Sequence, residues 1–211
     1  MQILFLECVD STQKYLKKLV LEDKITLPYA VVADYQTDGV GSRENKWNSI
    51  KNNLFLSFAI PLNELPKDLK LESSSIYFSY ILKETLQELG SFVWLKWPND
   101  FYINDKKIGG MITNIVKDSL ICGVGLNLVN SPDDFAKLDI AIERDFLLQR
   151  YFANIKKKSL WKQVFSKYKL EFYKNQNFYT HDKSLIIFLG NATLQDDGSI
   201  VINGERIYSR R

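Results

Sequence analysis

The chain has 211 residues, of which 45% are hydrophobic, so it can bury a substantial core in one principal domain with a small appendage. Its 28 basic and 25 acidic residues leave a formal net charge of +3, which is too small to argue for nucleic-acid binding on charge alone. No apolar run approaches the roughly 20 residues that span a bilayer, and the first residues do not have the pattern of a signal peptide. We therefore expect a soluble protein that does not enter a membrane.

The two cysteines and the single histidine limit the chemistry that the chain can perform. Cys8 and Cys122 lie in apolar, strand-like runs without the spacing of metal ligands or of a C-x-x-C motif, so we interpret both as buried thiols in a reducing, cytoplasmic compartment. His181 falls in a polar linker. These counts argue against a zinc site or a Cys/His nucleophile, and we expect chemistry based on carboxylates, amines, backbone donors or bound cofactors.

The first predicted elements are a short strand at residues 3–6 and an amphipathic helix that begins at Ser11 and Thr12. Either hydroxyl can cap the helix by accepting a hydrogen bond from an unpaired backbone N–H group. The alternative is that these hydroxyls contact a ligand, since the N-terminus of a helix also binds small polar groups well.

A buried-type strand at residues 29–33 leads into a long glycine-containing loop at residues 34–47. Gly39 and Gly41 allow backbone donors to approach an anion, and cationic or aromatic side chains follow them. These side chains are Arg43, Lys46 and Trp47. A surface loop without a ligand explains the glycines equally well. The next strand is expected at residues 54–60, where Pro61 ends it.

After a structural helix between Ser73 and Gly90, the sequence predicts an antiparallel meander at residues 92–116. Polar residues stand at its bends and starts, and they are Lys96, Asn99, Asp100 and Lys107. Gly109 and Gly110 lie inside the third strand, where glycine usually marks the close approach of a backbone or a ligand. This spacing suggests a cleft.

A strand at residues 120–128 carries Gly123 and Gly125 on one face, because strand side chains alternate between faces. Either a flat ligand or a tight helix-on-sheet contact can occupy that face. Two helices are predicted at 143–154 and 159–175, the second capped by Ser159, and both are expected to cover the back of the sheet. From residue 184 onward, short strands with tight turns predict a small β appendage.

Five motifs along residues 10–127 together resemble the catalytic domain of a biotin protein ligase. They are a Ser-Thr pair opening the first helix, a glycine loop ending in tryptophan, K-W-P-N-D, K-x-G-G and a G-x-G-x-N strand. In this chain they stand, in order, at Ser11-Thr12, Gly39 to Trp47, Lys96 to Asp100, Lys107 to Gly110 and Gly123 to Asn127. The family's loop usually carries more arginines, whereas this chain has Val40, Ser42, Glu44 and Asn45, with Arg43 as the one loop arginine. Gln13 stands where the family often has asparagine.

The resemblance implies an α+β fold, an α/β sandwich in which a mixed, mostly antiparallel sheet packs against helices. It implies a catalytic domain at 1–180 and a short SH3-like β domain at 184–211. The larger members of the family carry an N-terminal helix-turn-helix, and because this chain begins at the first catalytic strand, we expect no DNA binding. The resemblance leaves open whether the protein forms a homodimer.

The resemblance also implies a ligase that activates biotin with ATP and Mg²⁺, and then transfers it to a lysine of a biotin carboxyl carrier protein, an acetyl-CoA carboxylase subunit. Lys107 and Arg43 would be catalytic, and Asp100 would bind the metal. Biotin would contact Ser11, Thr12, Gln36, Gly39, Lys107, Gly109, Gly110, Gly123 and Gly125. ATP and the adenylate would contact Val40, Gly41, Ser42, Arg43, Lys46, Trp47, Lys96, Asn99, Asp100 and Asn127.

Two other functions stay open on the sequence. A lipoate or octanoate protein ligase has a similar fold, although K-W-P-N-D followed by K-x-G-G favours biotin. The second is a biotin or nucleotide sensor without catalytic activity, in which the altered loop no longer supports turnover.

Overall fold

A seven-stranded sheet forms the centre of the computed structural model, which describes residues 1–42, 45–182 and 185–208. Its strands, in spatial order, are β1 (Gln2–Val9), β2 (Tyr29–Gln36), β5 (Leu54–Pro61), β9 (Ser119–Leu126), β8 (Lys106–Val116), β7 (Asp100–Ile103) and β6 (Trp94–Lys96). β1 and β2 run parallel, and every other neighbouring pair is antiparallel. The expected meander at its β6–β8 end and the mostly antiparallel fold class are confirmed.

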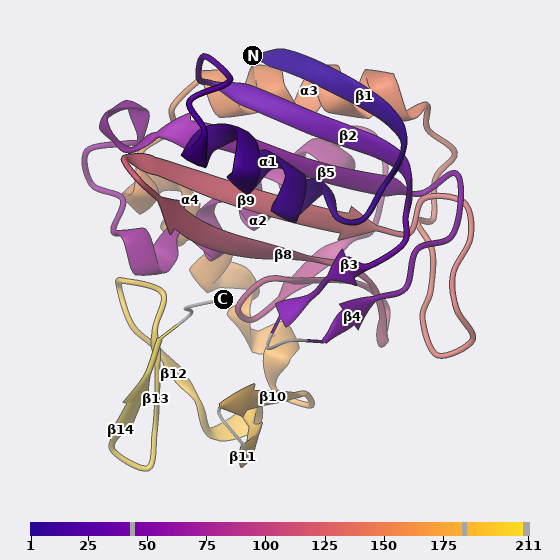
Figure 1. Cartoon of the computed structure of the whole chain (residues 1–211). Coiled ribbons are helices and arrows are strands. Elements are labelled where there is room, and N and C mark those ends of the chain that lie inside the picture. The colour runs from indigo at the N-terminus through magenta and orange to yellow at the C-terminus, as the bar shows by residue number, and fades with distance from the viewer. Residues whose placement is uncertain (43–44, 183–184, 209–211) are drawn as a thin grey trace.

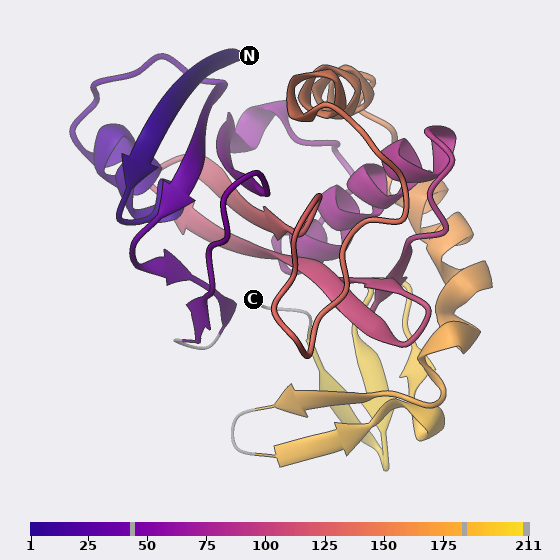
Figure 2. The ribbon, with the colours of Figure 1, turned by 90° about the vertical axis from the view of Figure 1, so that its right-hand side faces the viewer.

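Helix α1 (Thr12–Leu21) makes the crossover between the two parallel strands and covers one face of the sheet (Figures 1 and 2). Leu16 and Val20 are buried in a small core with side chains from β2, β5 and β9. Ser11 is the N-cap, and its Oγ accepts a hydrogen bond from the backbone N–H of Lys14 at 3.4 Å, as the sequence predicted. The capping geometry fixes the start of α1 directly after the end of β1.

Three helices cover the opposite face: α2 (Ser74–Glu88), α3 (Arg144–Lys156) and α4 (Trp161–Glu171) (Figure 2). α2 lies innermost, so residues on nearly all its sides are buried in the main core. Ser159 does not cap α4. The helix begins after Leu160, whose N–H donates to Gln163 Oε1, while the Asp68 carboxylate accepts from the first two helical N–H groups, and these bonds replace the expected hydroxyl.

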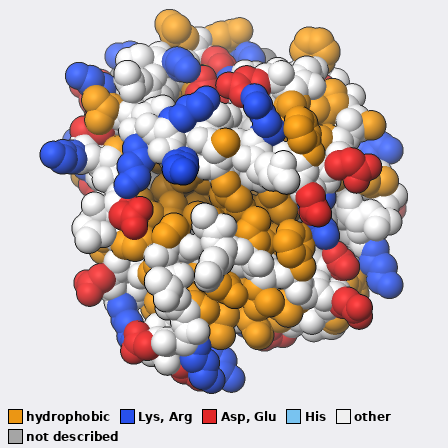
Figure 3. All heavy atoms as spheres, turned by 90° about the horizontal axis from the view of Figure 1, so that it is seen from above, with side chains coloured by type: hydrophobic (Ala, Val, Ile, Leu, Met, Phe, Trp, Pro, Cys, Tyr) orange, Lys and Arg blue, Asp and Glu red, His pale blue; other side chains and the backbone are white. Residues whose placement is uncertain are grey.

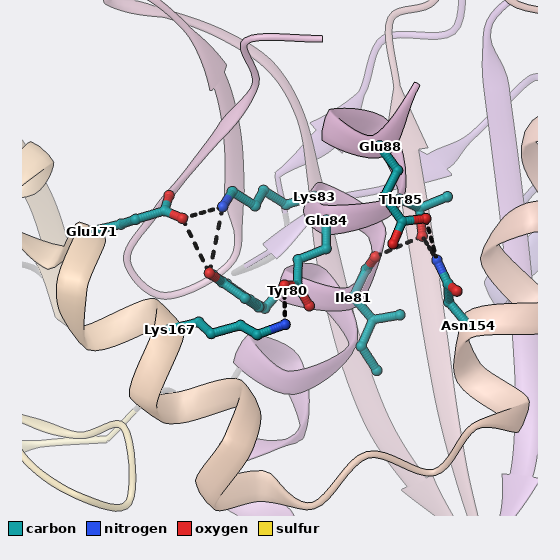
Figure 4. Close-up of polar contacts among 9 residues, drawn as sticks. All are labelled: Tyr80, Ile81, Lys83, Glu84, Thr85, Glu88, Asn154, Lys167 and Glu171. Atoms are coloured by element: carbon teal, nitrogen blue, oxygen red, sulfur yellow. Dashed lines mark hydrogen bonds and ion pairs between the residues drawn. The ribbon is translucent and has the colours of Figure 1, made fainter. Parts of the chain in front are cut away.

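A buried polar contact joins α2 to α4 (Figure 4). Lys83 on α2 is only 1% exposed, and its Nζ donates to the carboxylate of Glu171 at the end of α4. The hydroxyl of Tyr80 donates to the same carboxylate at 3.1 Å. We call these three residues the interhelical cluster. Burial lowers the pKa of Lys83, and Glu171 opposes this effect.

The C-terminal part consists of a hairpin and a small sheet. The hairpin pairs β10 (Tyr179–Asp182) with β11 (Leu185–Phe188), and the sheet contains β12 (Thr193–Leu194), β13 (Ile200–Ile202) and β14 (Glu205–Ile207). His181 therefore lies in a strand, opposite Ile186, and not in a linker as expected. The strand pairing begins at Tyr179, while the division into domains at 180 and 184 stays a prediction. Short 3-10 helices occur at Leu62–Glu64, Leu71–Ser73, Phe172–Asn175 and Leu189–Asn191.

The expectation that both cysteines are buried is correct for Cys122 and wrong for Cys8. Cys122 lies in the central strand β9, and burial raises the pKa of its thiol well above the usual value. Cys8 lies near the end of β1, an edge strand with β2 as its one hydrogen-bonded neighbour in the sheet, and it is exposed. None of the helices in the described ranges is long and apolar enough to cross a membrane.

Hydrophobic side chains also gather on the face that is seen from above in Figure 3. Between α2 and α3 there is a hollow of about 410 Å³, with apolar walls that include Phe78, Phe152 and Ile155. Lys156 and Lys158 also line it. This hollow lies on the face of the sheet that α2, α3 and α4 cover, so it is separate from the residues in the motifs.

Candidate active site

A cleft of about 360 Å³ brings most of the predicted site residues together. It lies between the start of α1, residues 36–42 and 45–47, the turn from β6 to β7, and strands β8 and β9. The predicted residues that line it are Ser11, Thr12, Gln36, Val40, Gly41, Ser42, Lys46, Trp47, Asn99, Asp100, Lys107, Gly110, Gly123 and Gly125. Because these residues come from five separate segments, the fold assembles the site.

One end of the cleft is a buried network of hydrogen bonds. The N–H of Thr12 donates to Gln36 Oε1 at 2.8 Å, and the Thr12 hydroxyl lies 2.9 Å from Ser57 Oγ. Ser57 in turn donates to Gln13 Oε1 at 3.0 Å. These four side chains are all buried, so their orientation is fixed before a ligand arrives. The network can recognise a compact polar group.

Ser57 and Gln13 line the cleft and were not predicted as site residues. Ser57 stands in β5 within an otherwise apolar run, and a polar residue in such a run was the available signal. Other lining residues that the sequence interpretation missed are Asn45, Met111, Ile112, Val124 and Phe135. Most of these are apolar, and nothing in a single sequence separates them from ordinary core residues.

The charged part of the cleft is a group of two lysines around one aspartate, which we call the active-site cluster. Lys107 Nζ lies 2.7 Å from Asp100 Oδ1, and Lys96 Nζ lies 3.3 Å from Asp100 Oδ2. Burial by itself would raise the pKa of Asp100, but the two lysines outweigh burial and hold this pKa below its usual value. Asp100 therefore stays ionised and holds both ammonium groups in place.

A break in strand register aims Lys107 into the cleft. Asp100 pairs with Gly110 and Phe101 with Gly109, but Tyr102 pairs with Lys107, so β8 carries one extra residue at this point. Without this irregularity Lys107 would point to the opposite face from Asp100, because strand side chains alternate. The bulge places both groups on the same face, where they form the ion pair.

The glycine face of β9 is covered by two side chains. A Cβ atom on Gly123 would lie 2.5 Å from Gln13 Oε1, and one on Gly125 would lie 2.5 Å from the Trp47 ring. The contact with Gln13 is a tight helix-on-sheet contact, which was one of the two expectations. The flat group on Gly125 is the indole of Trp47, whose Nε1 is buried without a hydrogen-bond partner among the described residues.

The segment expected to be a glycine loop contains two short strands, β3 (Gly39–Val40) and β4 (Lys46–Trp47), which pair with each other. Gly39 is packed against backbone, because a Cβ atom there would lie 2.8 Å from the carbonyl oxygen of Trp47. The Lys46 side chain is 85% exposed, and its Nζ lies 3.5 Å from Asp38 Oδ1. The predicted catalytic residue Arg43 lies outside the described residues, as does Glu44.

Four predicted residues lie beside the cleft and are absent from its described lining: Gly39, Gly109, Lys96 and Asn127. Gly109 allows β8 to approach β9, since a Cβ atom there would lie 2.5 Å from the Gly125 carbonyl oxygen. Asn127 is buried behind the site, where its Nδ2 donates to the Ala136 carbonyl oxygen at 3.1 Å. Lys96 lines an adjoining hollow of about 590 Å³ that shares Asp100 and Lys107 with the cleft.

A dedicated metal cage is not found in residues 1–42, 45–182 and 185–208, where no group of three or more His, Cys, Asp or Glu side chains could hold a metal ion. Asp100 is the carboxylate among the described lining residues of the cleft, and both of its oxygens contact lysines. This donor set suits an ion that takes most of its ligands from phosphate and water, which is the usual way Mg²⁺ binds with a nucleotide.

Comparisons with known proteins agree with this geometry. Residues 5–127 match the biotin/lipoate A/B protein ligase family. The chain is 32% identical over 130 residues to the bifunctional ligase/repressor BirA of Escherichia coli, a match that covers 58% of this chain and 39% of BirA. It is also 32% identical over 109 residues to biotin–protein ligase 2 of Arabidopsis thaliana, covering 47% of this chain and 32% of that protein. The chain thus spans well under half the length of these relatives.

Two solved structures resemble the whole chain. The Helicobacter pylori biotin acetyl coenzyme A carboxylase synthetase, solved with bound biotinylated ATP, has a TM-score of 0.94 at 36% identity, and the match covers 98% of this chain and 99% of that one. The Aquifex aeolicus biotin protein ligase in complex with biotin and ATP has a TM-score of 0.75 at 25% identity and covers 100% and 99%. The similarity therefore includes the C-terminal strands as well as the cleft.

Proposed function

The chain belongs to the biotin/lipoate A/B protein ligase family, and on this premise we propose that it activates biotin with ATP and transfers it to a lysine of an acceptor protein. The observation that carries this proposal is the division of one cleft into two parts. A buried network of neutral hydrogen-bonding groups lies at one end, and the active-site cluster lies at the other. A ligand with a polar uncharged head and a carboxylate tail matches both parts.

The first step would join two anions. A carboxylate oxygen of biotin attacks the α-phosphorus of ATP, the bond from that phosphorus to the bridging oxygen of the β-phosphate breaks, and pyrophosphate leaves with the electron pair. Lys107 supplies the positive charge at the point where the carboxylate meets the phosphate, because its side chain is fixed there by Asp100. In the second step the acceptor amine attacks the acyl carbon, and AMP leaves.

The uncharged end of the cleft would hold the ureido head of biotin. Ser11, Thr12 and Gln36 provide its hydrogen-bonding groups, and Ser57 and Gln13 fix their orientation. Gly110 and Gly123 line the path from this end to the active-site cluster. Gly39 and Gly109 allow close packing of backbone, and Gly125 allows the Trp47 indole to lie against the sheet, so these glycines would shape the walls of the biotin site.

The adenylate would lie under the β3–β4 ribbon. Val40, Gly41, Ser42, Lys46 and Trp47 line the cleft on that side, and Asn99 lines it from the turn between β6 and β7. Coverage by Trp47 would keep water away from the reactive acyl phosphate. The family resemblance supports a contact between Arg43 and the phosphate of the adenylate. Asn127 would act indirectly, because its side chain donates a hydrogen bond to the carbonyl oxygen of Ala136, in a loop next to the site.

Mg²⁺, the acceptor and the cellular setting belong to the same proposal. Asp100 is the residue that would contribute a ligand to Mg²⁺, which would lower the negative charge of the ATP phosphates. The acceptor would be a biotin carboxyl carrier protein, and the name of the H. pylori relative supports an acetyl-CoA carboxylase subunit. We further infer action in the cytoplasm, with a homodimer left open, and a division into a catalytic domain at 1–180 and a small β domain at 184–211.

Biotin-dependent exchange of label between pyrophosphate and ATP tests the proposal directly. The purified protein should exchange label when biotin is present and should not do so without it, because the adenylation step is reversible. Lipoate and octanoate, offered separately and in competition with biotin, serve as the control for substrate choice. Absence of exchange with biotin would contradict the proposal, and exchange supported by lipoate alone would assign the other branch of the family.

A further inference from the structure

The hollow between α2 and α3, of about 410 Å³, shares no described lining residue with the active-site cleft. Sites for small molecules have volumes of roughly 300–1,000 Å³, so this hollow is large enough for a small ligand. Part of its wall belongs to the main core, because Ile60, Tyr77 and Phe78 are all buried. The hydroxyl of Tyr77 donates to the Ser159 carbonyl oxygen at 2.7 Å, so this ring presents no unpaired donor. A ligand therefore meets a fixed, apolar surface.

Helix α3 supplies another wall of the hollow. Ile155 and Lys156 follow Phe152 by three and four residues, so all three side chains point to the same side of the helix. Phe152 and Ile155 are partly buried against the main core, whereas Lys156 is exposed. The apolar wall of α3 therefore ends at a positive charge.

The charged side chains of this hollow favour an anion. Among its described lining residues they are Glu64, Lys156 and Lys158. Lys158 Nζ lies 3.5 Å from Glu64 Oε2, so these two charges offset each other. Lys156 has no ion pair within the described ranges. The C-terminus of α3 adds a partial negative charge of about half a unit, which the full positive charge of Lys156 outweighs.

From this combination we propose that the hollow binds a free carboxylate with one apolar chain, which is the chemistry of a fatty acid. The chain lies against Phe78, Phe152 and Ile155, and the carboxylate contacts the ammonium group of Lys156. Burial of methylene groups supplies most of the affinity, and the ammonium group selects the charge of the head. The inference goes beyond the proposed function, because the hollow is separate from the cleft.

A second copy of the chain and a membrane surface are the other candidate occupants of an apolar hollow with lysines. A stable protein–protein interface involves roughly 20–30 residues on each side, and far fewer described residues line the hollow. A bilayer lipid has two chains, whereas the volume lies near the lower end of the range for small-molecule sites. A single-chain carboxylate fits both the size and the charge.

Three variants test the inference: Lys156→Gln, Ile155→Trp and the control Lys157→Gln. The first removes the charge, and the second fills the hollow with a larger side chain. Lys157 is exposed and is not among the described lining residues, so the control makes the same chemical change one residue away. Because Lys156 is exposed, its replacement keeps the test valid if Ile155→Trp lowers stability.

The measurement is calorimetric titration of decanoate into the whole chain, with and without saturating biotin, so that decanoate bound in the cleft is recognised by competition. We expect Lys156→Gln to weaken binding about 5-fold, as for loss of one partly exposed ion pair. Ile155→Trp should weaken it at least 10-fold, and Lys157→Gln should match the wild type. Decan-1-ol, which has no charge, should bind the wild type about 5-fold more weakly than decanoate and should bind Lys156→Gln about equally well.

Equal binding of decanoate by all four proteins, or no binding to the wild type, would overturn the inference. Equal affinity of the wild type for decanoate and decan-1-ol would also overturn it, because the anionic head would then not be recognised. A dimer in sedimentation that Ile155→Trp abolishes would assign the hollow to a second copy. Binding to phosphatidylglycerol vesicles that Lys156→Gln abolishes would assign it to a membrane surface. The exchange assay tests the proposed function separately, since decanoate binding requires no biotin activation.

Discussion

Among the described residues, the interhelical cluster and the active-site cluster both bring buried or partly buried lysines to a carboxylate, and they differ in charge balance. In the interhelical cluster one lysine, Lys83, meets one carboxylate, Glu171, and Tyr80 completes the hydrogen bonding (Figure 4). In the active-site cluster two lysines, Lys96 and Lys107, meet the single carboxylate of Asp100. The first cluster is neutral, and the second has a surplus of one positive charge.

This difference separates a structural role from a functional one. A neutral, hydrogen-bonded pair between helices has its charges compensated within the fold, so it needs no ligand. In the active-site cluster the lysines outnumber the carboxylate among the described residues, and this positive charge faces a cleft to which the proposed reaction brings a carboxylate and a triphosphate. The predictions below test whether stability depends on the first cluster and chemistry on the second.

The largest expected effect follows from removing the carboxylate of the interhelical cluster. Glu171→Leu leaves the ammonium group of Lys83 buried without a counterion, and we expect it to lower the free energy of unfolding by about 3 kcal/mol or more. Denaturant unfolding followed by circular dichroism measures this. The fraction that stays folded should activate biotin at the wild-type rate.

The matched control removes the other partner. Lys83→Met keeps the volume of the side chain and removes the buried charge, while Glu171 is partly exposed and retains the Tyr80 hydroxyl and Lys174 at 3.8 Å. Its cost should stay below about 1.5 kcal/mol. Equal destabilisation by the two variants would show that hydrogen bonding, and not the uncompensated charge, determines the stability of this contact.

The second effect concerns the chemistry of the active-site cluster. Lys107→Ala should slow single-turnover formation of biotinyl-AMP by about 10²- to 10³-fold, because it removes a preorganised charge at the place where negative charge accumulates. Lys106→Ala, on the exposed side of the same strand, is the control and should behave as the wild type. A wild-type rate for the Lys107 variant would show that another group supplies the charge.

A smaller effect is expected at the cover of the cleft. Gly125→Ala would place a methyl group 2.5 Å from the Trp47 ring, so the indole must move, at a cost of about 2 kcal/mol for overpacking. Gly110→Ala is the contrast, because its methyl group would come nearest to the end of the Asp100 side chain, at 3.2 Å, and would meet Asn99 and Lys107 at an ordinary contact distance of 3.6 Å. Tryptophan fluorescence should change in the first variant; an unchanged spectrum would mean that Trp47 does not lie on Gly125.

The smallest effect is a dependence of stability on alkaline pH. Burial, followed by nearby carboxylates, raises the pKa of Tyr80 in one cluster and of Tyr102 beside the other. Above pH about 10 the unfolded chain loses these protons and the folded protein keeps them, so stability falls as pH rises. Tyr80→Phe and Tyr102→Phe should each reduce this slope by about 1.4 kcal/mol per pH unit. Equal slopes in wild type and variants would contradict the raised pKa values.

The active-site cluster was predictable because its residues are close in sequence. Lys96 and Asp100 are four residues apart, on either side of a turn, and Lys107 follows on the next strand of the same meander. The bulge that turns Lys107 toward Asp100 was not predictable, since no residue type at that point requires it. The positions of most strands along the chain followed from hydrophobic patterns and turn residues, which are also local signals, whereas their order in the sheet was not predicted.

Residues that reach the site from distant segments were not predicted, because their contacts depend on the folded sheet and not on neighbours in the sequence. Ser57 reaches Thr12 and Gln13 because β5 lies beneath α1, a contact that depends on the whole sheet. β10 was not recognised as a strand, and His181 was placed in a linker, because the strand is short and polar. Ser159 was chosen as a helix cap on residue type, whereas Asp68 from a distant turn satisfies those N–H groups.

The most direct test of the account compares one lysine from each cluster in the same assay. Biotin-dependent exchange between pyrophosphate and ATP should fall by about 10²-fold or more in Lys107→Ala, whose unfolding midpoint stays near that of the wild type. In Lys83→Met, exchange should keep the wild-type rate. Comparable losses of exchange in both variants, or full exchange in Lys107→Ala, would contradict the claim that the surplus positive charge around Asp100 drives biotin activation.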